Sequence, residues 1–326
     1  MERAFVTGGS GFVGRNLIRT LIGRGDQVRA LVRSKAAAQA VESLGAEAVR
    51  GDLDETDVMR AGMRGCAVVF HAAAKVEEWG DPASYYHVNV TGTRNVLHAA
   101  REAAVPKLVH VSTEAVLADG GPLVQVNEAW AYPDRPIPRY PETKAESERL
   151  VLAANSESLA TVVIRPRFIW GGDDTSLLPQ LVSAVKSGRF MWIDGGHYLS
   201  STTHVDNVVE GLICGWRQGR GGEIYFVTDG EPVEFRQMIT ELLATQGIRI
   251  PDKRAPLWLI KAVAEVTERI WTLANIQRPP PATRVLVGLV AQEVTIDDSK
   301  ARSEIGYVGR MTREAGLAAM RSVAGN

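Results

Sequence analysis

The chain has 326 residues, of which 45% are hydrophobic and 23% are charged. This composition is ordinary for a globular protein and excludes a disordered or collagen-like chain, and the length predicts one large domain or two coupled ones. Basic and acidic residues number 37 and 38, for a net charge of −1, so we expect no general attraction to nucleic acid. The two cysteines, Cys66 and Cys214, form no CxxC pair, which argues against a disulfide framework and favours a reduced, cytoplasmic setting.

A membrane-spanning helix is not expected. The N-terminus enters a strand pattern within a few residues, which leaves no room for a signal peptide. The longest apolar stretch, residues 257–276, is interrupted by Lys261, Glu265, Glu268 and Arg269, whereas a spanning helix needs about 18 uncharged apolar residues. We therefore expect a soluble protein, or at most a peripheral one.

The first half of the chain alternates short apolar runs with longer helical patterns. This alternation predicts an α/β fold with a doubly wound, Rossmann-type parallel sheet covered by helices on both faces. Strands are expected at residues 3–7, 27–32, 46–50, 67–71, 107–112, 161–165 and 223–227. Helices are expected at residues 12–24, 36–43, 56–63, 84–103 and 140–155.

The rhythm changes after residue 165, where a glycine- and aspartate-rich turn is followed by helices near residues 177–186 and 204–216. We predict a nucleotide-binding domain made of residues 1–170 and 200–228. A smaller, mostly helical C-terminal substrate domain is expected from residues 171–199 and 229–326.

A glycine-rich turn joins the first expected strand to the first helix in the sequence TGGSGFVG. Glycine permits positive φ and a close backbone approach, and a helix N-terminus offers free N–H groups to a pyrophosphate. The same turn could merely reverse the chain, but the strand–turn–helix context favours a dinucleotide. The expected contacts are Gly8, Ser10, Gly11, Phe12, Val13 and Gly14.

The residues after the second and third strands predict which dinucleotide binds. An NAD site usually carries an acid after the second strand, whereas this chain has Arg33, a cation suited to the 2′-phosphate of NADP. Alternatively, Arg33 is a solvated surface residue, and the cofactor is then NAD. Asp52, followed by Leu53, is placed to accept from the adenine amine, or to cap the next helix.

Three side chains are expected to carry the chemistry. Tyr140 and Lys144 share one helix face at i, i+4 spacing, with Pro141 in the first turn, and Thr113 follows the fifth strand. Because the carboxyl ends of parallel strands meet at one edge, all three should lie in one crevice. A tyrosine there can protonate the alkoxide that hydride addition to a ketone leaves. We expect the Lys144 ammonium, together with the positive oxidised nicotinamide, to lower the Tyr140 pKa from about 10 toward 7.

These residues resemble the extended short-chain dehydrogenases/reductases, and most of all their 3β-hydroxysteroid dehydrogenase-like branch. The resemblance implies that Thr113, Tyr140 and Lys144 form a catalytic triad in which Tyr140 and Lys144 also touch the cofactor. It further implies that Ala72, Ala73, Ala74 and Pro166 line the cofactor. The matching motifs are TGGSGFVG at 7–14, HAAA at 71–74, NVTGT at 89–93, VST at 111–113, YPETK at 140–144, RP at 165–166, HVDN at 204–207 and DSKA at 298–301.

Two positions depart from related patterns. Nucleotide-sugar dehydratases carry an Asp-Glu pair after the residue matching Thr113, whereas this chain has Glu114 and Ala115, which disfavours dehydration. Arg167 replaces a small residue after the RP pair. Its guanidinium could meet an anionic substrate group or form a salt bridge at the sheet edge, and the sequence leaves both open.

Bulky apolar residues crowd the segments expected above the nicotinamide. Such a stripe is often core, but a subset would favour a large hydrophobic substrate over a sugar nucleotide. The candidates are Val76, Trp79, Phe168, Trp170 and Trp192. The six histidines show no metal-ligand spacing, so no metal is expected.

We therefore predict an NAD(P)H-dependent oxidoreductase that interconverts a secondary alcohol and a ketone on a steroid-like or β-keto acid-like substrate. The alternatives are a nucleotide-sugar epimerase and a non-catalytic dinucleotide sensor. The amphipathic segment 253–284 is expected to cap the substrate pocket or, alternatively, to touch a membrane surface. The sequence leaves open whether the protein forms a homodimer, and no nucleic-acid partner is expected.

Overall fold

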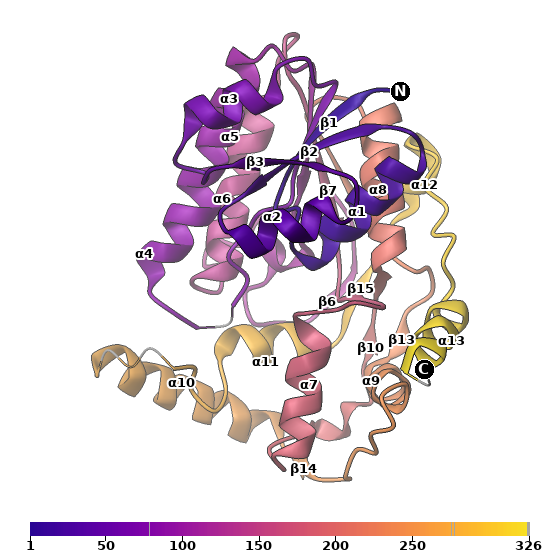
Figure 1. Ribbon diagram of the computed structural model, residues 1–326. Coiled ribbons are helices and arrows are strands. Elements are labelled where there is room, and N and C mark those ends of the chain that lie inside the picture. Colours follow the sequence, from indigo (N-terminus) through magenta and orange to yellow (C-terminus); the bar gives the residue numbers. More distant parts are fainter. Residues whose placement is uncertain (78, 275, 277, 325–326) are drawn as a thin grey trace.

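The computed structural model describes residues 1–77, 79–274, 276 and 278–324. Seven parallel strands form its central sheet in the order β12-β7-β5-β4-β1-β2-β3 (Figure 1). The strand order reverses between β1 and β4, which confirms the doubly wound topology. The strands are β1 (Arg3–Thr7), β2 (Gln27–Val32), β3 (Glu47–Arg50), β4 (Val68–His71), β5 (Lys107–Val111), β7 (Ala160–Pro166) and β12 (Glu223–Val227).

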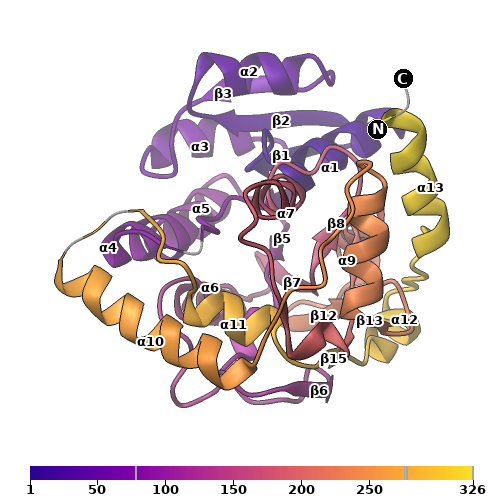
Figure 2. The same cartoon turned by 90° about the horizontal axis from the view of Figure 1, so that it is seen from below.

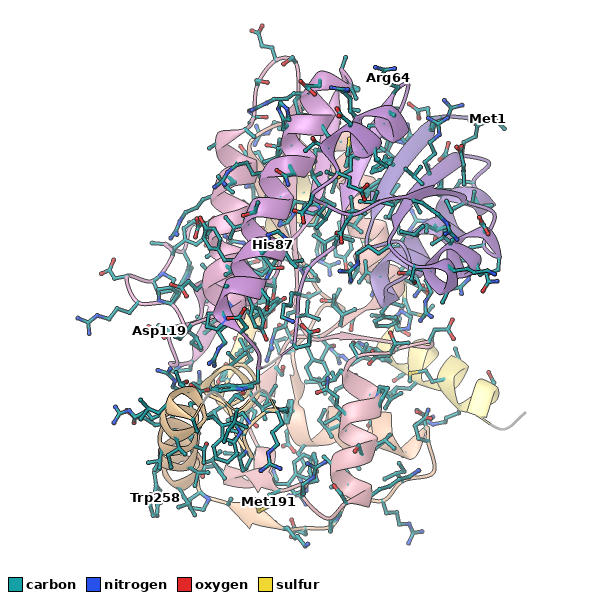
Figure 3. All side chains as sticks on the ribbon, turned by 60° about the vertical axis from the view of Figure 1, so that its left-hand side comes forward. Met1, Arg64, His87, Asp119, Met191 and Trp258 are labelled. Carbon is teal, nitrogen blue, oxygen red and sulfur yellow. The ribbon has the colours of Figure 1, made fainter. Side chains whose placement is uncertain are left out.

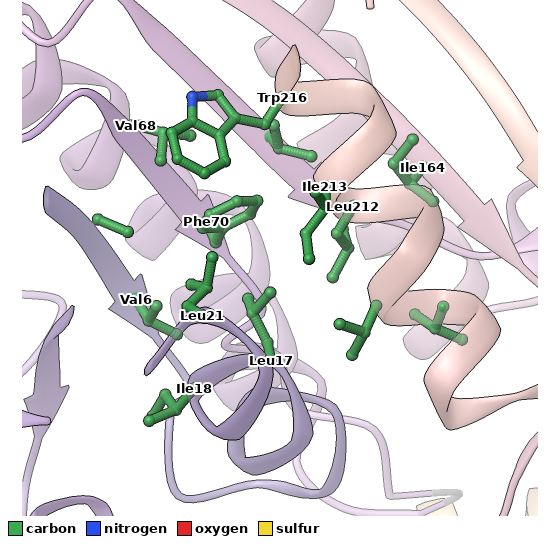
Figure 4. Packing of buried hydrophobic residues seen from close by; sticks show 14 of the residues in the cluster. Val6, Leu17, Ile18, Leu21, Val68, Phe70, Ile164, Leu212, Ile213 and Trp216 are labelled. Carbon is green, nitrogen blue, oxygen red and sulfur yellow. The ribbon is translucent and has the colours of Figure 1, made fainter. Parts of the chain in front are cut away.

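Helices cover both faces of this sheet. One face packs against α1 (Phe12–Gly23), α2 (Lys35–Glu42) and α8 (Val205–Gln218). The other packs against α3 (Thr56–Met63), α5 (Gly92–Glu102) and α6 (Tyr140–Ala153). In the first layer, Phe70 of β4 meets the Trp216 ring edge-on at 5.8 Å, with Leu17 and Leu212 nearby (Figure 4). Strand and helix periodicity in the sequence thus placed both core layers correctly.

The helix expected over residues 84–103 is divided into three parts. They are α4 (Pro82–Tyr85), the π-helix η1 (Tyr86–Thr91) and α5. The wide π-turn lies where Asn89 turns inward, accepts from the Lys75 backbone N–H at 2.7 Å and donates to the Lys75 carbonyl at 3.1 Å. A π-turn of this kind often marks a functional site, and its cause is a tertiary contact that helical periodicity does not show.

The smaller lobe lies below the sheet and combines helices with short strands (Figures 1 and 2). Its helices are α7 (Leu177–Lys186), α9 (Phe235–Ala244), α10 (Leu257–Leu273), α11 (Arg284–Val290) and α13 (Arg313–Ala324). A four-stranded sheet runs in the order β13 (Val233–Glu234), β10 (Leu199–Ser200), β15 (Val294–Ile296) and β6 (Leu123–Val126). Two further strand pairs join β11 (Thr203–His204) to β8 (Ile169–Trp170) and β14 (Arg254–Ala255) to β9 (Trp192–Ile193). The sequence did not predict these small sheets.

Two segments pack across the domain boundaries predicted from the sequence. Strand β6, from the first half of the chain, pairs with β15 of the smaller lobe. In the opposite direction, α12 (Ser299–Glu304) and Tyr307 join the core under the large sheet through Ala301 and Tyr307. The division at residues 170, 200 and 228 remains a prediction, and residues 78, 275, 277 and 325–326 of these domains lie outside the described part.

A buried ion pair fastens α6 to the sheet. Glu148 of α6 has no exposed surface, and Arg165 of β7 is 1% exposed. Arg165 donates to both carboxylate oxygens of Glu148, with Nε at 3.0 Å from Oε2. The hydroxyl groups of Ser112 and Tyr132 also donate to this carboxylate. Four donors therefore compensate for the lost hydration of the charge.

We expect Glu148→Gln to destabilise the fold by roughly 3–5 kcal/mol, because it leaves the Arg165 guanidinium buried without a counter-charge. Thermal or urea unfolding at pH 7 measures the loss. The matched control is Glu142→Gln, an exposed position on the same helix that should change the stability by less than about 0.5 kcal/mol. Equal stability of the two variants would contradict the role given to the pair.

Candidate active site

The glycine turn after β1 is built for close backbone packing. Gly8 has φ of 71°, and a Cβ atom there would lie 2.7 Å from the backbone of Ala72 and Ala73. A Cβ atom on Gly14 would lie 2.2 Å from the Gly8 carbonyl oxygen. The Gly11 N–H closes the turn onto that same oxygen at 3.0 Å. Any side chain at Gly8 or Gly14 would therefore displace the turn.

The start of α1 fits a pyrophosphate. Its N-cap, Gly11, offers no side chain to the first N–H groups of the helix, and Ser10 before it is exposed. The free N–H groups belong to Phe12, Val13 and Gly14. An anion is stabilised at such a helix end, so these residues suit the dinucleotide that the sequence predicted.

The ends of β2 and β3 bring Arg33 and Asp52 together. The Arg33 side chain is 73% exposed, and its only described ion pair is a long contact of 4.0 Å with Asp52. Asp52 does not cap α3; its Oδ1 instead accepts from the Leu53 N–H at 2.6 Å. Leu53 itself is buried against Gly92. Arg33 is therefore free to turn toward a phosphate group.

The segment after β4 lies directly against this turn. The Ala72 N–H donates to the Thr7 carbonyl at 3.2 Å, and the Ala73 N–H donates to the Thr7 hydroxyl at 3.3 Å. The same hydroxyl lies 2.7 Å from Nδ1 of His71. Burial and the nearby Lys144 charge lower the His71 pKa to about 3, so this ring is neutral and structural. Ala74 continues the same partly buried segment.

Thr113 and Tyr140 meet at the carboxyl edge of the sheet. Thr113 follows β5, and its hydroxyl lies close enough to the Tyr140 phenol to lower the pKa of that phenol. Tyr140 opens α6 directly after Arg139, whose φ of 71° is a left-handed conformation that costs energy in any residue with a side chain. The Arg139 guanidinium stacks on Trp79 at 3.6 Å from the ring centre. This stacking holds the strained entry into the helix, and with it the Tyr140 ring.

Lys144 lies one turn further and is 2% exposed. Its ammonium donates to the Val111 carbonyl at 2.8 Å and lies 3.1 Å from Nε2 of His110. Burial lowers the Lys144 pKa to about 8, although the Glu148 carboxylate raises it. The His110 pKa is lowered well below its usual value by burial and by the Lys144 charge, so this ring accepts from the ammonium.

The expected lowering of the Tyr140 pKa is not produced by the protein alone. Burial raises the Tyr140 pKa, and the Glu114 carboxylate raises it further; only the bond from Thr113 lowers it. The ammonium of Lys144 is bonded to β5 instead. A phenolate at neutral pH would thus need positive charge beyond that of these side chains.

Arg167 forms a salt bridge, which is one of the two roles left open by the sequence. Its guanidinium donates to Glu114 Oε1 at 2.8 Å, and both side chains are at most 4% exposed. The Leu289 carbonyl and the Ser200 hydroxyl accept from its other nitrogen at 2.6 and 3.3 Å. Since the charge of Arg167 is paired inside the protein, an anionic substrate group would have to compete with Glu114.

Glu114 also bonds to Thr113. The Thr113 hydroxyl donates to Glu114 Oε2 at 2.8 Å and accepts from the Ala115 N–H at 3.2 Å. Threonine has one hydroxyl proton, and in the structure this proton is donated to the Glu114 carboxylate.

The predicted substrate residues divide into exposed and buried positions. Val76 is 54% exposed beside the segment after β4, and Phe168 is half-buried with φ of 43°. Trp79 is buried and donates its indole N–H to the Ile276 carbonyl at 2.9 Å. Pro166 is buried at the end of β7, opposite Val227.

Trp170 and Trp192 lie in the core instead of a pocket. Trp170 has no exposed surface, donates to Asp229 at 2.7 Å and stacks edge-on against His204 at 4.8 Å. Trp192 is 2% exposed and packs against Phe190 at 4.9 Å. Direct substrate contact by these two rings is therefore not supported, because neighbouring side chains cover them.

A pocket of about 770 Å³ opens between the start of α6 and α10. Arg139 and Thr143, on either side of Tyr140, belong to its wall, and Glu268 and Leu273 of α10 close the far side. Among the described residues no group of three or more His, Cys, Asp or Glu side chains could hold a metal ion. Within the same residues no helix is long and apolar enough to cross a membrane.

The contacts of three residues of this site were not predicted from the sequence. His110 contacts Lys144, Glu148 accepts from Arg165, and Glu114 links Thr113 to Arg167. A signal existed for Glu148, since Tyr140, Lys144 and Glu148 repeat at i+4 along one helix face. His110 stood out as a polar residue in an otherwise apolar strand. Nothing local pointed to the partner of Glu114.

Comparison with known proteins places the chain among oxidoreductases. The family profile described as "3-beta hydroxysteroid dehydrogenase/isomerase family" matches residues 5–257. A 4-hydroxy-2-methyl-3-oxo-4-farnesyl-3,4-dihydroquinoline-1-oxide ketoreductase of Stigmatella aurantiaca is 52% identical over 98% of this chain and 96% of its own length. A 2-alkyl-3-oxoalkanoate reductase of Stenotrophomonas maltophilia is 35% identical over 98% of both chains.

Solved structures share the fold. The structure of MoeE5 in complex with UDP-glucose and NAD superposes with a TM-score of 0.75 at 23% identity, covering 98% of this chain and 97% of that one. At this identity the likeness concerns the fold, which confirms the doubly wound sheet.

The burial of Lys144 predicts a pH-dependent stability. The Lys144 pKa is about 8 in place of the ordinary 10.5. This lowering means that keeping the buried ammonium charged reduces the free energy of unfolding by roughly 3 kcal/mol, and the hydrogen bonds of the ammonium offset part of that loss. We therefore expect Lys144→Met to raise the melting temperature at pH 7 by about 2–5 °C. From pH 8 to 10.5 the folded chain loses this proton before the unfolded chain does, so the wild type gains stability and the difference shrinks.

Melting curves of both proteins at pH 7, 8.5 and 10 test this expectation. The control is Lys186→Met, an exposed lysine at the end of α7, which should show no such convergence. A constant or growing difference between Lys144→Met and the wild type would contradict the lowered pKa.

Proposed function

The chain belongs to the 3-beta hydroxysteroid dehydrogenase/isomerase family, and we propose that it reduces the ketone of a bulky apolar substrate with NADPH. It is an oxidoreductase that interconverts secondary alcohols and ketones with a nicotinamide dinucleotide. The reductive direction is supported by the two bacterial relatives, whose names are those of a ketoreductase and a reductase. Both of those substrates carry a ketone on a largely apolar skeleton.

The observation that carries the proposal is the placement of Tyr140 at the start of α6 beside Thr113, with Lys144 one turn further and bonded to the end of β5. When bound there, NADPH would supply the hydride. Tyr140 then gives its phenol proton to the substrate oxygen, and the Thr113 hydroxyl holds that oxygen or the phenol in line. Lys144 keeps a positive charge near the developing negative charge.

The raised Tyr140 pKa suits reduction. Burial and the Glu114 charge keep the phenol protonated, so the proton is present when a ketone arrives. In the oxidative direction the same group must act as a base, and the positive nicotinamide would be required to favour the phenolate. The side chains of this site thus favour the acid role of Tyr140.

A turnover screen with NADPH and NADP⁺ against steroids, β-keto acids and other apolar ketones tests the function. We expect net NADPH consumption with an apolar ketone, and a loss of kcat of at least about 100-fold in Tyr140→Phe with little change in cofactor affinity. Sugar interconversion without net cofactor consumption would instead support an epimerase. Cofactor binding with no turnover on any class would support a sensor.

The control for this variant is Tyr86→Phe, an exposed tyrosine whose hydroxyl bonds to Glu146 and not to the triad. Its kcat should equal that of the wild type. If Tyr140→Phe kept more than a tenth of the wild-type turnover, the proton donor would have to be another group.

Arg33 is expected to select NADP. Its exposed guanidinium can grip a 2′-phosphate, and charge-assisted hydrogen bonds are worth about 1.5–3 kcal/mol, which is a preference of about tenfold to a hundredfold. Arg33→Asp should reverse the preference, because an acid repels the phosphate and accepts from a free ribose hydroxyl.

The measurement is kcat/KM with NADPH and NADH for the wild type, Arg33→Asp and the control Arg64→Asp. Arg64 is an exposed arginine beyond the end of α3 and should leave the ratio unchanged (Figure 3). A wild type that prefers NADH would show that Arg33 is an ordinary surface residue.

A further inference from the structure

The hydroxyl group of Thr113 is already engaged on two sides. It donates its proton to Glu114 Oε2 at 2.8 Å, and it accepts from the Ala115 N–H at 3.2 Å at the start of the short 3₁₀-helix η2 (Glu114–Leu117). A hydroxyl group has one proton and two lone pairs, so one lone pair is left for any further partner. A ketone oxygen brings no proton and therefore cannot bond to Thr113 in this arrangement.

Arg167 holds the Glu114 carboxylate from the other side. Its guanidinium donates to Glu114 Oε1 at 2.8 Å, and also to the Leu289 carbonyl of α11 and the Ser200 hydroxyl of β10. Glu114 and Arg167 are 3% and 2% exposed, so water does not compete for these bonds. The acceptor of the Thr113 proton is thus fixed in place by contacts with the smaller lobe.

The Glu114–Arg167 pair acts on Tyr140 in two ways. Its carboxylate charge adds to burial in raising the pKa of the phenol, while the nearby Thr113 hydroxyl lowers that pKa. A hydroxyl group stabilises a phenolate only by donating a proton to it. In the structure the Thr113 proton is donated to Glu114 instead, so the phenolate would form without it.

The other charges around this network are directed elsewhere. The Lys144 ammonium is bonded to β5, and the Arg139 guanidinium is stacked on the Trp79 ring. Glu148 is paired with Arg165. The charged and titratable groups that lie around the pair and the phenol are Arg139, Lys144 and Glu148 on or before α6, His110 on β5, Arg165 on β7 and Tyr198 of the smaller lobe.

We propose that Glu114, held by Arg167, is a positioning residue that withholds the Thr113 proton from Tyr140 and so keeps Tyr140 in the acid form that ketone reduction requires. The inference rests on the proposed role of Tyr140 as the proton donor. In that reaction the ketone carbon takes a hydride from NADPH and the ketone oxygen takes the phenol proton, so the ketone is reduced and NADPH is oxidised. The Thr113 proton stays on Glu114 throughout, and the proton for the substrate comes from the phenol.

An NMR titration of the Tyr140 phenol tests the proposal without any substrate. The protein is labelled with tyrosine carrying carbon-13 at Cζ and is saturated with NADP⁺, whose positive ring favours the phenolate, and Tyr140→Phe assigns the resonance. In Glu114→Gln we expect the midpoint of Tyr140 ionisation to fall by at least about one pH unit, because a neutral amide does not repel the phenolate and binds the Thr113 proton less strongly.

Two further variants separate this role from a structural one. Glu114→Gln leaves the Arg167 guanidinium buried without a counter-charge, so the double variant Glu114→Gln/Arg167→Met, which removes the whole pair, should be more stable and show the same fall. Thr113→Val should change the Tyr140 midpoint little in the wild type, but should reverse part of the fall in Glu114→Gln. Only there is the Thr113 proton free to stabilise the phenolate.

The matched control is Glu142→Gln, an exposed acid two residues after Tyr140, which should shift the midpoint by less than about 0.3 pH units because water screens its charge. Lys144 is present in each of these proteins, so the loss of its charge near pH 8 affects all of them alike.

An unchanged Tyr140 midpoint in Glu114→Gln and in the double variant overturns the proposal. So does an equal effect of Thr113→Val with and without Glu114, since the Thr113 proton would then not be withheld. A failure of the proposed function is seen differently: NADP⁺ would leave the Tyr140 midpoint where it is in the free protein, or Tyr140→Phe would keep its turnover.

Discussion

A carboxylate with no exposed surface, that of Glu148, holds α6 against the central sheet and thereby sets the active site. The pair with Arg165 joins α6 to β7, and the bond from Ser112 joins it to the end of β5, one residue before Thr113. Lys144 lies one turn and Tyr140 two turns before Glu148 on the same helix face. Their positions above the sheet therefore follow from where this buried charge is fixed.

The same architecture brings an unusual density of buried charge to the sheet edge. Lys144, Arg165 and Arg167 are each at most 2% exposed, and they lie with Glu114 and Glu148. Buried pairs of this kind add little net stability, because desolvation offsets most of the attraction. Each guanidinium or ammonium instead fixes the position of a carboxylate or a carbonyl, and the Thr113 hydroxyl bonds to one of these carboxylates, that of Glu114, beside the Tyr140 phenol. A protonated phenol is the result.

Helix α10 borders the pocket beside the start of α6. Glu268 and Leu273 of this helix line the pocket beside Arg139 and Thr143, and Ala264 packs against residues around α11.

Local rules determined much of this protein from the sequence alone. Alternating apolar runs predicted all seven strands of the sheet, since a strand buried on both faces must be apolar, and the glycine spacing predicted the turn that only Gly8 and Gly14 permit. The topology then sent Thr113, Tyr140 and Lys144 to one edge. Only the tertiary structure decided the π-turn at Asn89, the pairing of β6 with β15, the burial of Trp170 and the Glu114–Arg167 bridge. Each of these depends on a contact between residues far apart in the chain, and a two-residue strand or a single buried charge has no period by which its partner can be found.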